Sequence, residues 1–331
     1  MKAQVCKAWG PPETLVYEDF PAPALGPDEV RIQVAAAGLN FPDTLMIAGK
    51  YQIKPPFPFV PGSEVAGRVI ELGAKAKRLK IGDRVMSTTS MAGGGGFCEE
   101  SVVREDMCFR LPEKMSWSEA AGFPITYGTT YHALVQRGRL KPGEVLLVHG
   151  AAGGVGLNAV ELGKAMGATV IGTVGSDEKK AIVQKYGADH VINYSTESIK
   201  DRVKALTGDK GADVIYDAVG GDAFDQSLRC IAWEGRLLVI GFASGRIPQA
   251  PANLLLLKGC EIVGVFWGAF AAREPETHRA NMEAMFRLYD EGKLHPHVSM
   301  NFPLSEVPQA MKALLGRSST GKIVIDVNQK L

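Results

Sequence analysis

The segment with the clearest chemical meaning is a cluster of glycines between two apolar runs. The aliphatic residues Val145 to Val148 are followed by the sequence HGAAGGVG, which ends at Gly156, and an apolar run that can form a helix begins at Leu157. This order of buried strand, glycine turn and helix is typical of dinucleotide-binding loops. Glycines let the backbone approach a pyrophosphate, and free N–H groups at the helix start attract its negative charge. The pattern therefore predicts a dinucleotide site, in preference to an ordinary turn.

The end of the next expected strand indicates which dinucleotide is bound. NAD-binding sheets usually carry an Asp or Glu there, which bonds the ribose hydroxyls. Here the strand Thr169–Val174 is followed by a Gly-Ser pair, and Lys179 and Lys180 lie close by. A carboxylate at this position would repel the 2′-phosphate of NADPH, whereas nearby cations attract it. We therefore expect NADPH rather than NADH. The alternative is a helix cap at Ser176 with solvated lysines, and the nearby Asp177 complicates the assignment.

Length and composition limit the kinds of protein that this chain can be. A chain of 331 residues exceeds the usual size of one hydrophobic core, so two domains are expected. A net charge of +1 without a long basic run gives no indication of a nucleic-acid partner. No apolar stretch is long enough to span a bilayer, and the opening MKAQVCKAWG lacks the apolar run of a secretion signal. The five scattered cysteines suit a reducing compartment, so we expect a cytoplasmic protein with no membrane partner.

The elements that must position the glycine loop alternate between strand and helix. Beyond Ser116 the expected strands are Val145–Val148, Thr169–Val174, Val191–Asn193, Asp213–Asp217, Gly235–Ile240 and Glu261–Phe266, with helical segments between most of them. This alternation predicts a doubly wound parallel sheet of the Rossmann type. Before Ser116, short strands such as Val30–Ala36 and Phe97–Val103 are separated by turn signals, and Met91–Gly96 reads as one such turn. They predict a β-rich domain of barrel type.

The motifs AAGGVG, GLNFPD, PGSEVAGRV and IGDRV together resemble the zinc-independent medium-chain dehydrogenases/reductases, the zeta-crystallin-like quinone oxidoreductases. The resemblance spans nearly the whole chain. It implies an α/β protein with a GroES-like catalytic domain, residues 1–121 and 269–331, and a Rossmann NADPH-binding domain, residues 122–268. Zinc-dependent members of the superfamily hold the metal with an early Cys and a His-Glu pair, but these positions appear here as Asn40 and Ser63-Glu64. The four-cysteine structural zinc loop is also missing, so we expect no metal.

The resemblance also assigns site residues. It implies that Asn40 and Tyr51 bond the substrate oxygen, whereas Asp43 orients its neighbours or has only a structural role in its loop. It assigns Lys179 and Tyr194 to the 2′-phosphate, with Ser176 as a weaker candidate. The other expected cofactor contacts are Thr126, Gly150, Ala152, Gly153, Gly154, Val155, Gly156, Val219, Gly241, Phe242, Ala243, Phe266, Trp267, Arg317 and Lys322. The alternative for the aromatic residues Phe242, Phe266 and Trp267 is that they belong to the hydrophobic core. The alternative for Arg317 and Lys322 is that they are ordinary surface charges.

The reaction follows by elimination, because the chain has no nucleophile elbow, no P-loop and no metal motif. Hydride transfer from nicotinamide C4 needs no protein nucleophile, and without zinc it favours substrates activated by conjugation. We therefore expect an NADPH-dependent, zinc-independent quinone or enone reductase. The alternatives are an enoyl-thioester reductase of the acrylyl-CoA type and a non-catalytic, crystallin-like or RNA-binding NADPH protein. The strand Glu261–Phe266 is a plausible sheet edge, so we also expect a homodimer.

Overall fold

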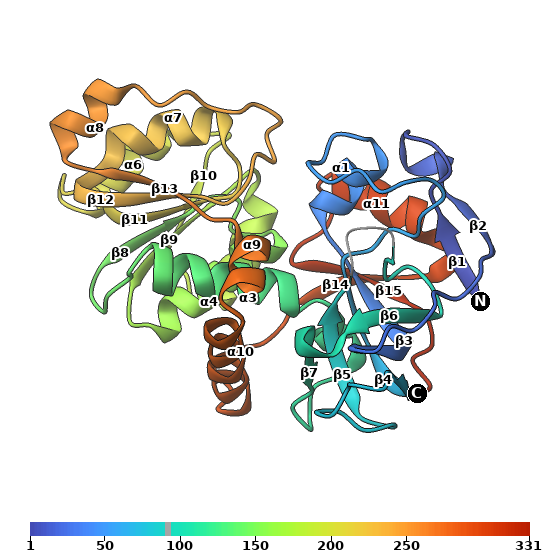
Figure 1. Cartoon of the computed structure of the whole chain (residues 1–331). Helices are drawn as coiled ribbons and strands as arrows, with labels where there is room; N and C mark the ends of the chain where they lie inside the picture. The colour runs from blue at the N-terminus through green and yellow to red at the C-terminus, as the bar shows by residue number, and fades with distance from the viewer. Residues whose placement is uncertain (90–93) are drawn as a thin grey trace. The chain divides into compact units, whose positions relative to one another are not determined.

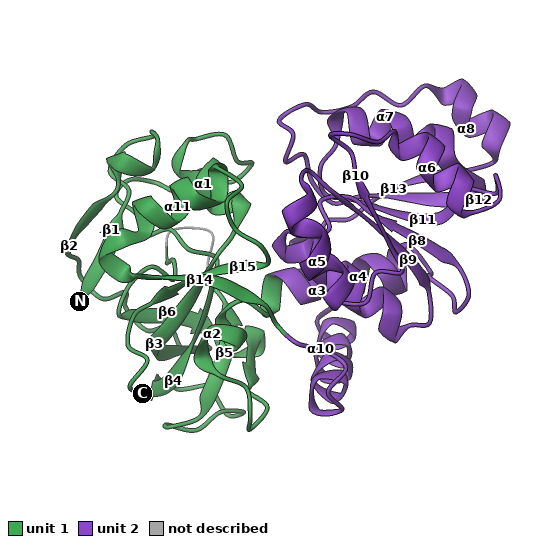
Figure 2. Cartoon of the chain, turned by 180° about the vertical axis from the view of Figure 1, so that it is seen from behind, with its two compact units in different colours: residues 1–125, 296–331 green, residues 126–295 purple. Residues whose placement is uncertain are grey.

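The computed structural model describes residues 1–89 and 94–331 (Figure 1). Part of the expected turn Met91–Gly96, residues 91–93, lies outside the described residues. The chain divides into two compact units, one formed by residues 1–125 and 296–331 and the other by residues 126–295 (Figure 2). We call them unit 1 and unit 2 and describe each separately.

Unit 2 is a parallel sheet with helices on both faces. In sheet order its strands are β10 (His190–Asn193), β9 (Thr169–Val174), β8 (Val145–Val148), β11 (Ala212–Asp217), β12 (Ile231–Val239) and β13 (Glu261–Gly264). Every neighbouring pair is parallel. The chain winds outward in both directions from β8 and β11, and ligands of such sheets bind beyond the carboxyl ends of the strands where the direction reverses. The predicted Rossmann arrangement is confirmed.

The helices of unit 2 follow the alternation that the sequence predicts. They are α3 (Pro124–His132, continued by a π-helical turn Ala133–Arg137), α4 (Gly154–Ala165), α5 (Lys180–Lys185, after a 3-10 turn Asp177–Lys179), α6 (Ile199–Leu206), α7 (Gly221–Cys230), α8 (Ala252–Lys258), α9 (Trp267–Arg273) and α10 (Pro275–Asp290). Helices α6 and α7 cover one face of the sheet, and α3 and α4 cover the other (Figure 1). Leu147, Ile171 and Ile215 fill the core between these layers.

The boundary of unit 2 differs from the sequence prediction of residues 122–268. The unit runs from residue 126 to residue 295 and therefore includes α9 and α10. The His132 ring stacks on Phe270 with ring centroids 3.8 Å apart. The side chains of Gln136 and Asn281 exchange hydrogen bonds of 3.0 and 3.2 Å. These contacts attach α9 and α10 to α3 and its π-helical turn, which explains why the segment after β13 stays with the sheet.

Unit 1 is built on an antiparallel sheet that both parts of its chain share. In order its strands are β14 (Val298–Pro303), β15 (Lys322–Asp326), β3 (Glu29–Leu39), β4 (Glu64–Leu72), β5 (Arg84–Thr88) and β7 (Cys108–Arg110), with β6 (Glu100–Arg104) also paired to β3 and with β14 parallel to β15. Strands β1 (Lys2–Val5) and β2 (Val16–Asp19) form a separate hairpin sheet. Because β15 pairs with β3, the C-terminal strand lies beside the end of β3, with Ile323 opposite Leu39.

Among the described residues of unit 1, three α-helices accompany the strands. They are α1 (Phe41–Ile47), α2 (Trp117–Ala121) and α11 (Val307–Leu315). Helix α2 begins with a capping box, because the Ser116 hydroxyl accepts from the Glu119 N–H and the Glu119 carboxylate accepts from the Ser116 N–H. Helix α1 is absent from the sequence prediction. In the part of the chain that the structure describes, no helix has the length and apolarity needed to cross a bilayer.

Candidate functional site

Unit 1 buries a cluster of polar side chains where three strand ends meet. Asn40 follows β3 and caps α1, Glu64 begins β4, and Lys322 begins β15. Because β3 pairs with both β4 and β15, these three residues converge although they are far apart in the sequence. Two glycines leave the room they need. A Cβ at Gly38 would lie 2.5 Å from the Glu64 Oε1, and one at Gly122 would lie 3.0 Å from the Lys322 Cγ.

A buried ion pair is the centre of this cluster. The Lys322 Nζ lies 2.8 Å from the Glu64 Oε1, and the two side chains are 8% and 0% exposed. The same ammonium donates to the Leu39 carbonyl at 2.8 Å and to the Asn40 Oδ1 at 2.9 Å. The Asn40 Nδ2 donates to the Glu64 Oε1 at 2.8 Å, and the Ile125 N–H donates to Oε2 at 2.9 Å. A buried charge is tolerated away from water only when it is paired and hydrogen-bonded, as both the ammonium and the carboxylate are here.

This arrangement argues against the cofactor contact predicted for Lys322. An ammonium has three donors, and here all three bond to groups of unit 1. Lys322 is also not an ordinary surface charge, the other possibility for this residue, because it is buried. Sequence reasoning gave no role to Glu64, because its partner lies 258 residues further along the chain.

Asp43 and Tyr51 lie close to the ion pair. The Asp43 Oδ2 accepts from the Asn40 N–H at 2.8 Å, and its Oδ1 accepts from the Ser63 hydroxyl. Burial raises the pKa of Asp43 to about 6 against the opposing effect of these hydrogen bonds. Burial and the Asp43 charge raise the pKa of Tyr51, so its hydroxyl stays protonated at neutral pH. Asp43 thus fixes the start of α1, the orienting role expected of it, and the half-buried Tyr51 keeps a proton to donate.

The donor set of this cluster does not suit zinc. A zinc site needs three or four nitrogen, sulfur or carboxylate ligands, and thiolate or imidazole ligands predominate. Asn40 and Ser63 supply neither, and the Glu64 carboxylate is already paired with an ammonium. A metal ion beside that ammonium would be repelled. Among the described residues, no group of three or more His, Cys, Asp or Glu side chains could hold a metal ion.

The glycine loop in unit 2 has the geometry of an anion site. Gly150 has a φ of +64°, which favours glycine. A Cβ at Gly156 would lie 2.2 Å from the Gly150 carbonyl oxygen, so only glycine fits there. The N-cap of α4 is Gly153, which has no side chain to satisfy the first N–H groups of the helix. These N–H groups, at Gly154, Val155 and Gly156, are therefore donors suited to a pyrophosphate.

The loop after β11 packs against the glycine loop, and the loop after β12 is hydrogen-bonded to the loop after β11. The Asp217 Oδ1 accepts from the N–H groups of Val219 and Gly220, both at 2.8 Å. The Val219 side chain packs against Gly150, because a Cβ at Gly150 would lie 3.1 Å from the Val219 Cγ2. The two loops are joined by backbone hydrogen bonds, including one from the Ala243 N–H to the Ala218 carbonyl. Asp217 was given no role from the sequence, although an acidic residue ending a buried strand was the available signal.

The residues expected at a 2′-phosphate gather after β9. Tyr194 is 41% exposed, and a Cβ at Gly175 would lie 2.7 Å from its hydroxyl oxygen, so the ring lies against the Gly-Ser turn. Asp177, which complicates the assignment, is paired. Its carboxylate lies 2.8 Å from the Lys180 Nζ and accepts from the Asn193 Nδ2 at 3.1 Å. Asp177 is therefore already paired and has less negative charge with which to repel a phosphate at the turn that holds Ser176 and Lys179.

The other residues predicted to contact the cofactor differ in burial and in the unit to which they belong. The Thr126 hydroxyl accepts from the Asn158 Nδ2 at 2.8 Å, which holds it beside α4. Phe242 and Phe266 are 38% and 64% exposed. Trp267 is buried and meets His278 edge-on with ring centroids 5.3 Å apart, so its surroundings match the core alternative. Arg317 is exposed in the turn after α11, in unit 1.

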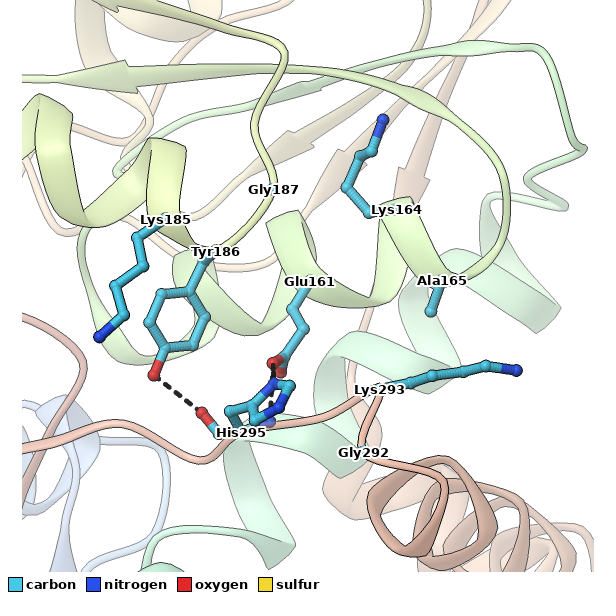
Figure 3. Close-up of a pocket in the computed structure, with 9 residues that line it drawn as sticks. All are labelled: Glu161, Lys164, Ala165, Lys185, Tyr186, Gly187, Gly292, Lys293 and His295. Carbon is cyan, nitrogen blue, oxygen red and sulfur yellow. Dashed lines mark hydrogen bonds and ion pairs between the residues drawn. The ribbon is translucent and has the colours of Figure 1, made fainter.

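Another buried carboxylate, that of Glu161 on α4, lies in a surface pocket of unit 2 (Figure 3). Its Oε2 accepts from the Tyr127 hydroxyl at 2.7 Å. Its Oε1 accepts from the His295 N–H at 2.6 Å and from the His295 Nδ1 at 3.0 Å. The Tyr186 hydroxyl donates to the His295 carbonyl at 2.9 Å. The lysines of this pocket point in different directions and do not converge on one ligand (Figure 3).

Two family models match the chain. The model of the alcohol dehydrogenase GroES-like domain matches residues 26–113, and that of the zinc-binding dehydrogenase matches residues 154–287. The chain is 45% identical to the quinone oxidoreductase-like protein 2 homolog of Nematostella vectensis, over 99% of this chain and 89% of that protein. It is 37% identical to the quinone oxidoreductase of Pseudomonas aeruginosa, over 96% and 97%.

A solved structure agrees with these matches. The quinone oxidoreductase of Escherichia coli complexed with NADPH has a TM-score of 0.91, 30% sequence identity and coverage of 98% of this chain and 100% of that chain. A GroES-like unit combined with a doubly wound sheet and a glycine loop defines a medium-chain dehydrogenase/reductase. Within that class, the chain belongs to the quinone oxidoreductase family.

Proposed function

We propose that the protein is an NADPH-dependent, zinc-independent reductase that transfers hydride from nicotinamide C4 to a conjugated acceptor, a quinone or an enone. The observation that carries this proposal is the buried Lys322–Glu64 ion pair beside Asn40, because Asn40 and Glu64 stand at positions that the resemblance assigns to the metal site of zinc-dependent members. Without a metal to polarise the carbonyl, acceptors already activated by conjugation are favoured. The family and the NADPH complex of the Escherichia coli relative support the same conclusion.

Several groups of the chain would hold NADPH. The N–H groups at the start of α4 suit its pyrophosphate, and Ser176, Lys179 and Tyr194 surround the turn suited to the 2′-phosphate. The bound nicotinamide supplies the hydride. On the acceptor side, the Asn40 amide and the protonated Tyr51 hydroxyl would donate hydrogen bonds to the oxygen on which negative charge develops.

The test is the loss of NADPH absorbance, measured beside NADH, with 1,4-benzoquinone, 9,10-phenanthrenequinone, a simple enone and crotonyl- or acrylyl-CoA. We expect turnover of the conjugated carbonyls with NADPH and no loss of activity in EDTA.

In Lys179→Met, kcat/KM for NADPH should fall about tenfold, since one charge-assisted hydrogen bond is worth about 1.5 kcal/mol. The value for NADH should stay the same, because NADH has no 2′-phosphate.

Other outcomes of this assay favour the alternatives. Preference for the thioesters would assign the protein to enoyl-thioester reduction. NADPH binding without turnover of any acceptor would favour a non-catalytic NADPH protein. Inactivation by EDTA would refute zinc independence.

We also propose that the protein is a cytoplasmic homodimer. Strand β13 is at the edge of the sheet, and the nearby Trp233, Leu256 and Leu257 are 67%, 81% and 68% exposed. A strand edge flanked by exposed apolar side chains favours pairing with a second copy. All five cysteines are free, which suits a reducing compartment. A monomeric mass at micromolar concentration would contradict the dimer.

A further inference from the structure

We propose that Lys322 is a positioning residue for the reaction: its buried ammonium fixes the Asn40 amide so that one N–H is presented to the oxygen of the acceptor. The inference rests on the proposed function and names the residue that replaces a metal cation at this site. It does not place Lys322 in contact with the substrate, because all three of its donors are used within unit 1.

The hydrogen bonds leave the Asn40 amide one orientation. Since an ammonium only donates, the atom 2.9 Å from the Lys322 Nζ must be the carbonyl oxygen of the amide. The amide nitrogen then faces the Glu64 carboxylate, to which it donates one proton at 2.8 Å. Rotation of the amide by half a turn would bring the nitrogen against the ammonium and the oxygen against the carboxylate. Both contacts would be repulsive, so the ion pair excludes the flipped state.

The second amide proton of Asn40 is the group that this orientation makes available. An amide nitrogen carries two protons, and among the described residues only Glu64 accepts one of them. The side chain is 7% exposed, so the second proton lies in a nearly dry environment, where a hydrogen bond to a developing oxyanion is strong. The Asn40 main chain is held as well, because its N–H donates to the Asp43 carboxylate at 2.8 Å.

The charge of Lys322 also acts on the amide. An oxygen that accepts from an ammonium draws electron density from the amide nitrogen, which makes the remaining N–H a better donor. The Glu64 carboxylate, which accepts the other amide proton, has the opposite effect, so orientation is the main contribution of the ion pair. The ion pair therefore supplies an oriented N–H donor at the position where a zinc-dependent relative would supply a metal ion.

A double-mutant cycle tests whether Lys322 acts through Asn40. We would measure kcat/KM for 9,10-phenanthrenequinone in wild type, Asn40→Ala, Lys322→Met and the double variant. Loss of one oxyanion donor lowers turnover by about a hundredfold, and we expect each single variant to lose at least tenfold. Because both changes remove the same oriented N–H, the double variant should be no slower than the slower single variant.

Two binding measurements and two further variants separate positioning from general damage. The dissociation constant for NADPH, from a fluorescence titration, should stay the same in all variants, and hydroquinone should bind more weakly to Lys322→Met than to wild type. Because that variant leaves Glu64 charged and buried, the neutral pair Glu64→Gln with Lys322→Met provides a second test if the single variant does not fold. The matched control is Lys312→Met, which removes an exposed lysine paired with Glu13 in the same unit and should keep full activity.

The outcomes separate this inference from the proposed function. If wild type reduces no acceptor, the proposed function is refuted. If wild type is active and the losses of the two single variants multiply in the double variant, Lys322 does not act through Asn40. Full activity of Lys322→Met or of the neutral pair would also overturn the inference.

Discussion

The buried Asp43 should make unit 1 more stable in mild acid, and Asp43→Asn should abolish this effect. The variant can keep the local hydrogen bonds. Its amide oxygen can accept from the Asn40 N–H, and its amide nitrogen can donate to the Ser63 hydroxyl, which the Asp43 carboxylate accepts from in the wild type. The change therefore removes a titrating group from the core, and any hydrogen bond that the amide does not replace costs the same at each pH, so the pH dependence isolates the titration.

The sign and size follow from the raised pKa. Burial raises the pKa of Asp43 from 3.8 to about 6. A carboxyl group whose pKa is raised on folding binds its proton more tightly in the folded state, so it contributes stability at low pH that is lost as the pH rises through the folded pKa. Between pH 7 and pH 5 this contribution should grow by about 1.4 kcal/mol, the value of roughly one pKa unit. The effect runs opposite to that of a salt-bridged carboxylate.

Urea unfolding at pH 5 and pH 7 measures the effect. The unfolding free energy of wild type relative to Asp43→Asn should rise by about 1.4 kcal/mol on going from pH 7 to pH 5. The control is Asp19→Asn, an exposed carboxylate of the same unit whose pKa is lowered by Lys2, so any change there should have the opposite sign. A difference between wild type and Asp43→Asn that is the same at both pH values, or that falls at pH 5, would refute the reasoning.

Two further predictions concern unit 2. In Gly156→Ala the new Cβ would lie 2.2 Å from the Gly150 carbonyl oxygen, so the loop must shift, and NADPH should bind at least about tenfold more weakly in a fluorescence titration. The control Gly264→Ala, which has open space around it, should bind NADPH normally, and unchanged affinity of Gly156→Ala would contradict the loop geometry. Glu161→Ala removes the acceptor of the buried Tyr127 hydroxyl and should cost about 1–3 kcal/mol of stability in thermal unfolding. The exposed carboxylate of Glu283 is the control, and equal melting temperatures for Glu161→Ala and Glu283→Ala would count against the prediction.

The fold could be predicted where local patterns determine it. The aliphatic run at Val145 and the glycines after it specify strand, turn and helix, and the alternation that follows specifies the parallel sheet. The start of helix α1 also has a recognisable sequence pattern, with Asn40 at the N-cap, a proline at the second helical position and Asp43 at the third. The π-helical turn after α3 has none, because one additional residue per turn does not change the hydrophobic pattern.

The parts that could not be predicted depend on contacts between distant residues. Lys322 pairs with Glu64 only because β15 and β4 flank β3, and neither residue carries a local sign of its partner. The assignment of α9 and α10 to unit 2 depends in the same way on Phe270 meeting His132. The geometry of the glycine loop, in contrast, depends on its own backbone, so the local sequence is enough to predict it.

The carboxylate of Glu161 has a consequence for how this chain could be cut and rejoined. Tyr127 is the second residue of unit 2 and His295 is its last, and both bond to Glu161. The place where the chain enters the unit and the place where it leaves are thus anchored to one side chain. Domains with adjacent ends tolerate excision, insertion into a host protein and circular permutation. Residues 126–295 therefore form a continuous module with neighbouring ends, which could be excised or inserted as one piece.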